Sequence, residues 1–526
     1  MNQSYDGSDR PGTDSGPLPD AVIAGGGPAG LTAAYELTKH GGYSVVLESD
    51  PHMVGGISRT DVYKGYRFDI GGHRFFSKSD EITALWEEVL GEQLITRSRM
   101  SRIYYDGKFF DYPLRPMNAL VGLGPFRATM ILLSYFKARV LPIQPERSFE
   151  DWVVNRFGRK LFQIFFKTYT EKVWGMPTHT ISADWAAQRI KGLSLTKAVI
   201  NALFGGSGKN AKGEVIKTLI DSFQYPRLGP GQMWEMTRDR IVKDGGDVVN
   251  DRKVVRIKHD GAHVNAFVAR GSDGREHTYQ GRHYLSTLPI RSLIRALDPP
   301  PPPAVIEAAN ALKYRDFLTV VLIVDQPKTF PDNWIYVHEP QVKLGRVQNF
   351  KNWSPDLVPD PTKSSLGLEY FCFEGDDLWT MSDDQLVALG TKEIAAIGLV
   401  KSDKVIDGCV VRMPKAYPVY DDVYQSHLGV IRRWLKTLDN LHLAGRNGMH
   451  KYNNQDHSMM TALLVARNIL GLSQLDPWCV NTDAEYHEEK EPVDNQAGRV
   501  VPMPLGDKHA TTRAVRAGRG KRDGKR

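Results

Sequence analysis

The sequence predicts an α/β protein in which one nucleotide-binding domain is assembled from discontinuous segments, with other regions inserted between them. Near the N-terminus, two short apolar runs, Ala21–Ala24 and Tyr43–Leu47, flank a glycine turn and the helix-compatible stretch Leu31–Lys39. Near the C-terminus, Asn440–Arg446 resembles a strand returning to the same sheet. A strand–helix–strand unit with a late additional strand is typical of an open, Rossmann-like sheet.

The glycine turn predicts a dinucleotide site. Its three glycines have G-x-G-x-x-G spacing, in which the first permits a tight turn, the second lets a pyrophosphate approach the backbone and the third lets helix and strand pack closely. The helix N-terminus offers unpaired N–H groups to phosphate. Glu48, after the second strand, is placed to accept hydrogen bonds from a ribose. The predicted contacts of the turn are Gly25, Gly27, Pro28, Ala29 and Gly30.

A second glycine segment, Val54–Thr60, indicates which dinucleotide binds. It resembles the second glycine motif of the FAD-binding, glutathione-reductase-like families, which include amine oxidases, protoporphyrinogen oxidases, phytoene desaturases and UDP-galactopyranose mutases. Glycines there allow close backbone approach, and the following polar side chains suit phosphate. The resemblance implies FAD as the cofactor, bound by a domain of glutathione-reductase type. Further cofactor-binding candidates are Gly55, Gly56, Ser58, Arg59 and Val254.

Composition limits the class of protein. A chain of 526 residues, 41% of them hydrophobic, can form two or more domains. Its three cysteines are far apart and in no metal-binding spacing, so we expect a reducing compartment, no disulfide scaffold and no metal. The N-terminus lacks the pattern of a signal peptide, and a cytoplasmic location is expected.

No apolar run reaches the roughly 18 residues needed to cross a bilayer. The strongest candidate, Ala119–Leu141, is interrupted by Pro125, Arg127 and Lys137. It is expected to be a helix packed on the core, with a peripheral membrane contact left open. Most of the net charge of +7 comes from the basic tail, 505–526, which is predicted to be disordered. No nucleic-acid partner is therefore expected, and formation of a homodimer stays open.

The remaining elements follow in order. Helices are predicted at Asp80–Leu90, across a region from Gly122 to Phe204, and at Met233–Lys243, Gln385–Ile397 and Tyr424–Leu438. A hairpin is predicted at Lys253–Ile257 and Val264–Val268, and further strands at Tyr284–Pro289, Phe317–Val324, Trp334–His338 and Leu366–Cys372. Pro299–Pro303 is expected to form a polyproline spacer.

These elements predict two interleaved domains with flanking tails. The predicted segments are a disordered N-terminal tail (1–19), the FAD-binding domain in three parts (20–110, 236–298 and 439–472), a mainly helical substrate insertion (111–235), a mixed-sheet substrate domain (299–438) and a C-terminal extension (473–526).

The segment Gly158–Gly175 closely resembles a helix and loop of UDP-galactopyranose mutases. In that family a Tyr-Thr-Glu-Lys-x-Trp block supplies an aromatic wall for the uracil, and here the block contains Tyr169 and Trp174. Aromatic faces stack on nucleotide bases, which suits this role. Phe162 and Phe165, at helical spacing, are instead expected in the core.

Three arginines resemble groups that grip the diphosphate or line the substrate site in those mutases. Arg189 stands one residue from the position of a diphosphate-binding arginine, and Arg315 and Arg346 fall in two further mutase-like segments. The planar guanidinium can bind two phosphate oxygens at once. The alternative for Arg315 and Arg346 is a solvated surface salt bridge.

The C-terminal segment Gly445–Gly448, followed by Tyr452 and Asp456, resembles the part of the mutases that crosses the flavin and begins a helix facing it. A helix dipole there would stabilise negative charge on reduced flavin. His73 matches a mutase histidine beside the flavin, although a lone histidine can also be a core residue. Two departures are evident: Phe76 replaces a second histidine, and Asn454 replaces an aspartate. The predicted flavin-binding residues of this segment are Gly445, Arg446 and Asp456, and the predicted catalytic residues are His73, Arg189, Arg315 and Tyr452.

The resemblance implies a flavoenzyme that isomerises a nucleotide sugar between pyranose and furanose through a reduced-flavin N5 adduct, with NAD(P)H as one candidate electron donor. The alternative is an FAD-dependent oxidoreductase of the amine oxidase, protoporphyrinogen oxidase or desaturase type, whose pocket should be apolar. A third class is a non-catalytic, FAD-stabilised scaffold that uses the basic tail.

Overall fold

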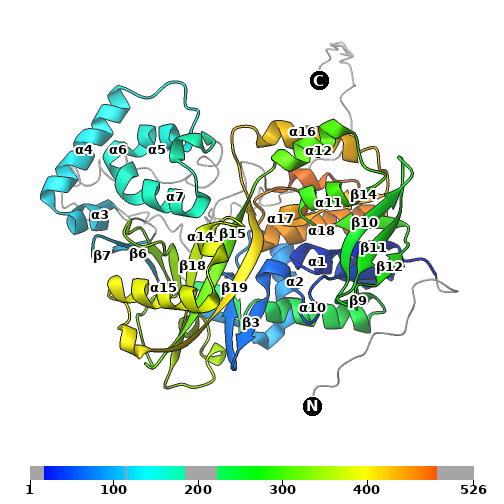
Figure 1. The fold of residues 1–526 in the computed structure, drawn as a ribbon, viewed down its shortest axis with the longest axis horizontal. Coiled ribbons are helices and arrows are strands. Elements are labelled where there is room, and N and C mark those ends of the chain that lie inside the picture. Colours follow the sequence, from blue (N-terminus) through cyan, green and yellow to red (C-terminus); the bar gives the residue numbers. More distant parts are fainter. Residues whose placement is uncertain (1–16, 113, 115, 184–221, 482–526) are drawn as a thin grey trace, which may run out of the picture.

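A five-stranded parallel sheet joins the beginning, the middle and the end of the chain (Figure 1). The structure is a computed structural model that describes residues 17–112, 114, 116–183 and 222–481. The strand order is β20–β13–β1–β2–β9. The strands are β1 (Ala21–Ala24), β2 (Ser44–Leu47), β9 (Asp247–Val249), β13 (His283–Ser286) and β20 (Leu441–Leu443). The mixed α/β fold predicted from the sequence is therefore confirmed.

Four helices pack on one face of this sheet around a core that includes Leu31, Trp86, Trp234 and Met459. The helices are α1 (Pro28–Lys39), α2 (Asp80–Leu90), α10 (Gly231–Lys243) and α18 (Gln455–Ile469). The predicted bounds of α2 match the structure, because Ser79 caps its N-terminus and its apolar positions have helical spacing.

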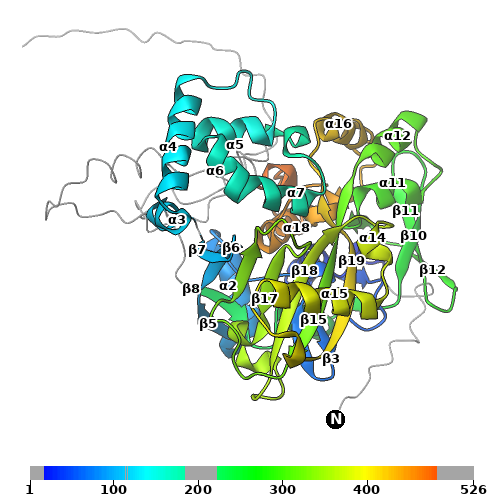
Figure 2. The same cartoon turned by 60° about the vertical axis from the view of Figure 1, so that its left-hand side comes forward.

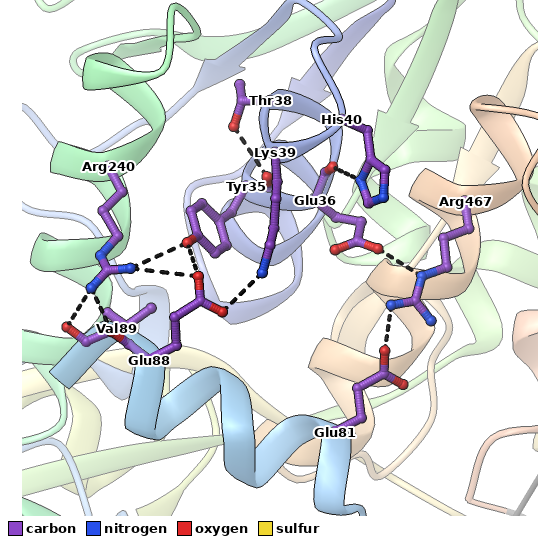
Figure 3. Close-up of polar contacts among 10 residues, drawn as sticks. All are labelled: Tyr35, Glu36, Thr38, Lys39, His40, Glu81, Glu88, Val89, Arg240 and Arg467. Carbon is purple, nitrogen blue, oxygen red and sulfur yellow. Dashed lines mark hydrogen bonds and ion pairs between the residues drawn. The ribbon is translucent and has the colours of Figure 1, made fainter. Parts of the chain in front are cut away.

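Polar contacts tie these helices together at the rim of the core (Figure 3). Tyr35 and Lys39 of α1 donate to the two carboxylate oxygens of Glu88 in α2, at 2.6 and 2.9 Å. Arg240 of α10 donates to the Tyr35 hydroxyl at 3.2 Å and to the backbone carbonyl of Val89 at 3.3 Å. Three helices from distant parts of the sequence therefore converge on Glu88.

A second contact joins the C-terminal helix to the same group. Arg467 of α18 donates to Glu36 of α1 at 2.6 Å and also to Glu81 of α2 (Figure 3). The helix that begins with the glycine turn is thus fixed to α18, which comes more than four hundred residues later in the chain.

A four-stranded sheet and three helices cover the other face of the parallel sheet. The strands, in the order β12–β11–β10–β14, are β10 (Lys253–His259), β11 (Val264–Arg270), β12 (Glu276–Tyr279) and β14 (Leu297–Asp298). The helices are α11 (Ile290–Ala296), α12 (Pro303–Ala311) and α16 (Tyr424–Leu435). The predicted hairpin is present as β10 and β11.

A separate seven-stranded sheet has the order β19–β15–β18–β17–β16–β6–β7. Its strands are β6 (Ser101–Tyr105), β7 (Lys108–Asp111), β15 (Tyr314–Val324), β16 (Trp334–Val337), β17 (Arg346–Asn349), β18 (Ser364–Cys372) and β19 (Val405–Pro418). Neighbours are antiparallel except for β16 and β6. Helix α15 (Asp383–Ala396) packs on one face through the apolar cluster that contains Leu368 and Leu386. The predicted segment 20–110 contained β6 and most of β7, whereas parallel pairing with β16 places them in this sheet.

A helical region stands over the edge formed by β6 and β7 (Figures 1 and 2). It comprises α3 (Pro116–Leu123), α4 (Pro125–Val140), α5 (Phe149–Phe157), α6 (Arg159–Phe162), a π-helical turn (Gln163–Lys167) and α7 (Thr168–Trp174). Phe162 and Phe165 are buried there, as predicted. Two short antiparallel pairs, β3 (Thr60–Tyr63) with β4 (Tyr66–Asp69) and β5 (Leu94–Ser98) with β8 (Ser222–Pro226), complete the sheets, and only the first is a hairpin.

Two local differences from the sequence prediction have physical causes. The last strand ends at Leu443, and Gly445, with φ of +83°, leads into α17 (Gly445–Gly448). The proline run is not an extended spacer throughout, because Pro303 begins α12, where its fixed φ is favourable. Within the described ranges no helix is long and apolar enough to cross a bilayer. The predicted N-terminal tail and C-terminal extension fall almost entirely outside those ranges.

Candidate functional site

The first glycine turn has the geometry that its sequence predicts. Gly25 has φ of +102°, and a Cβ there would lie 2.3 Å from the Thr287 hydroxyl oxygen. A Cβ on Gly30 would lie 1.9 Å from the Gly25 carbonyl oxygen, so only glycine fits where α1 crosses the turn. Gly27 is the N-cap of α1 and Pro28 its first residue, with no side-chain cap and no acidic residue in the first turn. The N–H groups of this helix end are therefore available to an anion.

Glu48 is held against the same turn. Its Oε2 accepts a hydrogen bond from the Gly26 N–H at 2.7 Å, and its Oε1 accepts one from the Asp50 N–H at 2.9 Å. The carboxylate is largely buried at the end of β2. Because each carboxylate oxygen has a further lone pair, Glu48 can also accept from a ligand hydroxyl.

The second glycine segment lies directly over the first. The Gly55 N–H donates to the Gly26 carbonyl at 2.8 Å, and an added Cβ on Gly56 would lie 3.4 Å from the Gly27 Cα. Gly55 and Gly56 both have positive φ, which only glycine adopts readily. Two side-chain-free backbones thus pack directly against each other at the N-terminus of α1.

Two polar residues follow this segment. Ser58 is buried, and Arg59 lies 3.6 Å from Asp50 and 3.4 Å from Asp61. The buried Nε of Arg59 has no hydrogen-bond partner among the described residues. An unpaired buried donor is costly, so an anionic ligand beside this segment would complete the site. These observations fit a flavin dinucleotide.

The C-terminal segment contacts the first turn. A Cβ on Gly445 would lie 3.0 Å from the Ala29 Cβ, and the Gly445 N–H donates to Thr461 at 3.0 Å. Arg446 donates through Nε to the Asn453 carbonyl at 2.8 Å. Asp456 lies in the first turn of α18. Segments more than four hundred residues apart therefore meet at the start of α1.

Val254 lies farther along the chain, in β10. It is buried in the cluster between the parallel sheet and the four-stranded sheet. The pairing of β10 with β11 shifts register after Val254, at a β-bulge. Such irregularities redirect local backbone groups. A cofactor contact at Val254 stays a prediction.

His73 connects the cofactor side to the substrate side. Its Nδ1 is buried and has no hydrogen-bond partner among the described residues. Burial, together with the positive charges of Arg446 and Arg346, lowers the pKa of His73 to about 3. The imidazole is therefore neutral at physiological pH, and it can donate or accept a hydrogen bond but carries no charge.

An aromatic wall formed by Tyr169, Tyr336 and His338 lies between α7 and the seven-stranded sheet. Tyr169 stacks on His338, with ring centroids 4.8 Å apart and an interplanar angle of 10°. The Tyr336 ring meets Tyr169 edge-on at 5.4 Å. Burial raises the pKa of Tyr169 well above its usual value and lowers that of His338 to about 3, so both rings are neutral. The wall is thus a packed group of uncharged rings.

Lys172 fixes α7 to this wall. Its ammonium group donates to the backbone carbonyls of Val337, Glu339 and Leu344 at 3.2, 2.6 and 3.0 Å. Burial lowers the pKa of Lys172 to about 8. Because Val337 and Glu339 flank His338, these bonds hold the stacked residue in place.

Arg346 lies beside the wall and is paired with a buried acid. Its Nε donates to Glu369 at 2.6 Å, and Gln348 donates to the other oxygen of Glu369 at 2.7 Å. Its guanidinium carbon lies 5.9 Å from the Tyr336 ring centre. The alternative interpretation of the sequence was a solvated surface salt bridge for Arg346. Its partner Glu369 is instead completely buried. The pair therefore lies within a low-dielectric site, where its field is strong.

A second aromatic group links Arg346 to the cofactor side. Tyr452 stacks on Tyr417 at 5.5 Å, and Trp174 lies 6.2 Å from Tyr452. The guanidinium of Arg446 lies 5.4 Å from the ring of Tyr417 and 5.2 Å from that of Tyr452. Since Arg446 directly follows Gly445, a continuous line of side chains runs from the glycine turn to the aromatic residues of α7.

Arg315 is buried on the other side of α7, with no salt bridge among the described residues. Its Nε donates to the Val173 carbonyl at 2.9 Å, and its Nη2 donates to the Lys172 and Phe371 carbonyls at 3.1 and 2.9 Å. These bonds satisfy carbonyl groups at the end of α7. Burial lowers the pKa of Arg315 to about 10, which still leaves it charged at neutral pH.

Sequence reasoning placed most of these residues but missed others. Arg189 lies outside the described residues. The residues of the site that were not anticipated are Tyr336, His338, Lys172, Glu369 and Tyr417. The sequence does indicate Tyr336 and His338. Together with Trp334 they alternate along the predicted strand, so the three side chains must share one face.

The chain belongs to the family described as flavin containing amine oxidoreductase, whose model matches residues 28–470. This confirms the predicted family and implies the predicted FAD. The chain is 25% identical over 435 residues to coproporphyrinogen III oxidase of Mycobacterium leprae, covering 78% of this chain and 90% of that protein. The same enzyme of Mycobacterium tuberculosis H37Rv is 24% identical over 438 residues, with the same coverage.

Solved structures share the fold. Reduced UDP-galactopyranose mutase superposes with a TM-score of 0.74 at 22% identity, covering 88% of this chain and 99% of that one. A triple mutant of putrescine oxidase superposes with a TM-score of 0.57 at 15% identity, covering 86% and 99%. At these identities the likeness is one of fold, and both a mutase and an oxidase have it.

Proposed function

We propose that this flavoenzyme binds FAD across its two glycine segments, in a domain of glutathione-reductase type, and isomerises a nucleotide sugar between pyranose and furanose forms. The observation that carries the proposal is the stack of Tyr169 on His338 beside Arg346. Flat neutral rings next to a fixed cation suit a nucleotide base followed by phosphate. A purely apolar substrate would have no use for Arg346, Gln348 and His73 at the same place.

The proposed binding mode divides the substrate between two groups of residues. Tyr169 and Trp174 contact the base, and Arg346 attracts the diphosphate. Arg346 keeps its position because Glu369 and Gln348 hold it. Arg189 retains its proposed diphosphate role from the family resemblance alone.

Arg315 is proposed to act in two ways. Its Nε and Nη2 hold the end of α7, which carries Tyr169 and Trp174. Its Nη1 makes no hydrogen bond within the described part of the chain and remains available to a phosphate oxygen. A buried cation of this kind stabilises negative charge that develops on a departing diphosphate.

Bound FAD, in its reduced form, would supply an electron-rich ring for reaction at the anomeric carbon, with NAD(P)H as the proposed electron donor. The residues around it set its environment. The N-terminus of α18 would stabilise negative charge on the reduced ring. His73, neutral and with an unpaired Nδ1, would hydrogen-bond near the ring without adding charge, and Tyr452 would cover it.

The test is turnover by purified, FAD-loaded protein reduced with dithionite under anaerobic conditions. A panel of UDP-linked and other nucleotide sugars is added, and the products are separated by anion-exchange chromatography and identified by NMR. We expect a furanose isomer of one nucleotide sugar with reduced protein and none with oxidised protein. Failure of every nucleotide sugar to isomerise would contradict the proposal.

The second candidate is an FAD-dependent oxidoreductase, favoured by the identity to coproporphyrinogen III oxidases over most of the chain. Arg346 and Arg446 could bind the carboxylates of an anionic substrate as readily as phosphates. The same preparation, oxidised, distinguishes this candidate: anaerobic bleaching of the flavin by a porphyrinogen or an amine, without any sugar isomer, would establish it.

A further inference from the structure

Helix α4 (Pro125–Val140) and its flanks expose an unusual number of large apolar side chains. Of the fifteen large hydrophobic residues that are exposed in the described part of the chain, seven lie within the stretch 121–141. Phe126 is 80% exposed, Val140 76% and Leu141 68%. The seven residues are Val121, Phe126, Met130, Leu133, Phe136, Val140 and Leu141. Apolar residues concentrated in this way mark a contact surface, whereas scattered ones do not.

The exposed apolar side chains within α4 itself share one face of the helix. Ile131, Tyr135 and Ala138 are buried, and they form the side of α4 that packs on the rest of the helical region. At about 100° per residue, Phe126, Met130, Leu133 and Val140 lie on the opposite side. The exposed apolar face therefore has no partner among the described residues. We call the exposed apolar residues of this helix, Phe126, Met130, Leu133, Phe136 and Val140, the α4 face.

The charged residues of α4 and its flanks are all basic. Between Asp111 and Glu146 the sequence contains no acidic residue, whereas Arg115, Arg127, Lys137 and Arg139 are basic. Arg127 is paired with Asp106 at 2.6 Å. Lys137 and Arg139, in the last turn of α4, are exposed and have no ion pair in the described structure.

The position of α4 suits a surface contact. In both views α4 lies at the outer edge of the helical region, away from the two large sheets (Figures 1 and 2). It packs on α5 and α6, which lead directly into α7. With 16 residues, α4 is too short to cross a bilayer but long enough to lie along one.

We propose that the α4 face binds the surface of a membrane that contains anionic lipids. Phe126, Leu133 and Val140 would enter the boundary between headgroups and acyl chains, and Lys137 and Arg139 would reach the lipid phosphates. A second copy of the chain is a poorer partner, because its own α4 would bring further basic side chains to the contact and no acid from this stretch to neutralise them. The charge of the face thus selects an anionic lipid surface.

The experiment is co-sedimentation of the full-length, FAD-loaded protein with sucrose-filled vesicles. Vesicles of phosphatidylcholine alone are compared with vesicles that contain 30% phosphatidylglycerol. We expect binding to the anionic vesicles, at least tenfold weaker binding of the triple variant Phe126→Ser, Leu133→Ser, Val140→Ser, and a comparable loss for Lys137→Glu with Arg139→Glu. The matched control is Val62→Ser with Leu472→Ser, which removes exposed apolar residues elsewhere and should bind like the wild type.

All the substituted side chains are exposed, so each variant should fold like the wild type. Flavin absorbance and the thermal midpoint of unfolding check this for each variant. Equal vesicle binding by wild type and triple variant would overturn the proposal and place any lipid contact elsewhere, for example in the basic stretch 505–526. A dimer by light scattering that the triple variant converts to a monomer, without vesicle binding by the wild type, would also overturn it in favour of a second copy.

Discussion

The glycine segments and the aromatic wall are both parts of the proposed site, but their geometry is determined in different ways. At the glycine turn, Gly25 and Gly30 meet within six residues of chain, and the constraint is a backbone distance. At the wall, Tyr169 comes from α7, His338 follows β16, and Arg346 and Glu369 come from neighbouring strands. The cofactor side thus depends on local chain geometry, and the substrate side depends on how distant strands pair. A change in one should affect the protein differently from a change in the other.

The largest effect is expected at the glycine turn. Gly30→Ala places a Cβ 1.9 Å from the Gly25 carbonyl oxygen, so the turn must open. We expect loss of most bound flavin and a decrease of about 3 kcal/mol in the free energy of unfolding. Flavin absorbance per polypeptide and urea denaturation measure the two effects.

Gly429→Ala is the matched control. Gly429 lies inside α16, and the nearest atom to an added Cβ is 3.7 Å away. Alanine should therefore leave flavin content unchanged and raise stability by about 0.5 kcal/mol or more. Normal flavin content in Gly30→Ala would contradict the close approach of α1 to the turn.

The next effect concerns the arginine that holds α7. Arg315→Lys removes the fork that reaches three buried carbonyls, and we expect the free energy of unfolding to fall by about 2 kcal/mol. Arg412 also donates to two backbone carbonyls, those of Trp379 and Met381, but it is partly exposed to water. Arg412→Lys should therefore lower the free energy of unfolding by less than about 1 kcal/mol. Urea denaturation measures both changes. An equal decrease in the free energy of unfolding for the two variants would contradict the expectation that burial strengthens the contacts of Arg315.

A smaller, pH-dependent effect is expected from His73, between the two regions. Its pKa in the folded protein is about 3, while an unfolded histidine titrates near 6.5. As the pH falls through this window, the unfolded chain takes up a proton that the folded chain does not, so stability is lost toward acid. When the pH is lowered from 7.5 to 5.5, the free energy of unfolding of the wild type should fall by about 1 kcal/mol more than that of His73→Gln. His52→Gln, at an exposed position, should behave like the wild type. No difference between His73→Gln and wild type would contradict a neutral, buried His73.

The same contrast explains what the sequence could predict. The glycine turn, Glu48 and the second glycine segment were recognisable because they follow one another at short spacings within residues 25–56. Tyr169 and Trp174 were predicted through their resemblance to a known block, and their role in binding remains a proposal. Glu369 could not be found, because its significance depends on the pairing of β17 with β18, which brings Arg346 opposite it. The three carbonyl contacts of Arg315 likewise depend on the packing of α7 against β15, which no local pattern encodes.

The central claim is that the wall formed by Tyr169, Tyr336 and His338 is a nucleotide-binding surface. Isothermal titration of the FAD-loaded protein with UDP tests it most directly, using Tyr169→Ala and, as a matched tyrosine deletion away from the wall, Tyr63→Ala. The account predicts that wild type and Tyr63→Ala bind UDP alike, and that Tyr169→Ala binds at least tenfold more weakly, because loss of a stacked ring costs about 1–3 kcal/mol. Equal UDP affinity in all three proteins, or no binding to any of them, would contradict it.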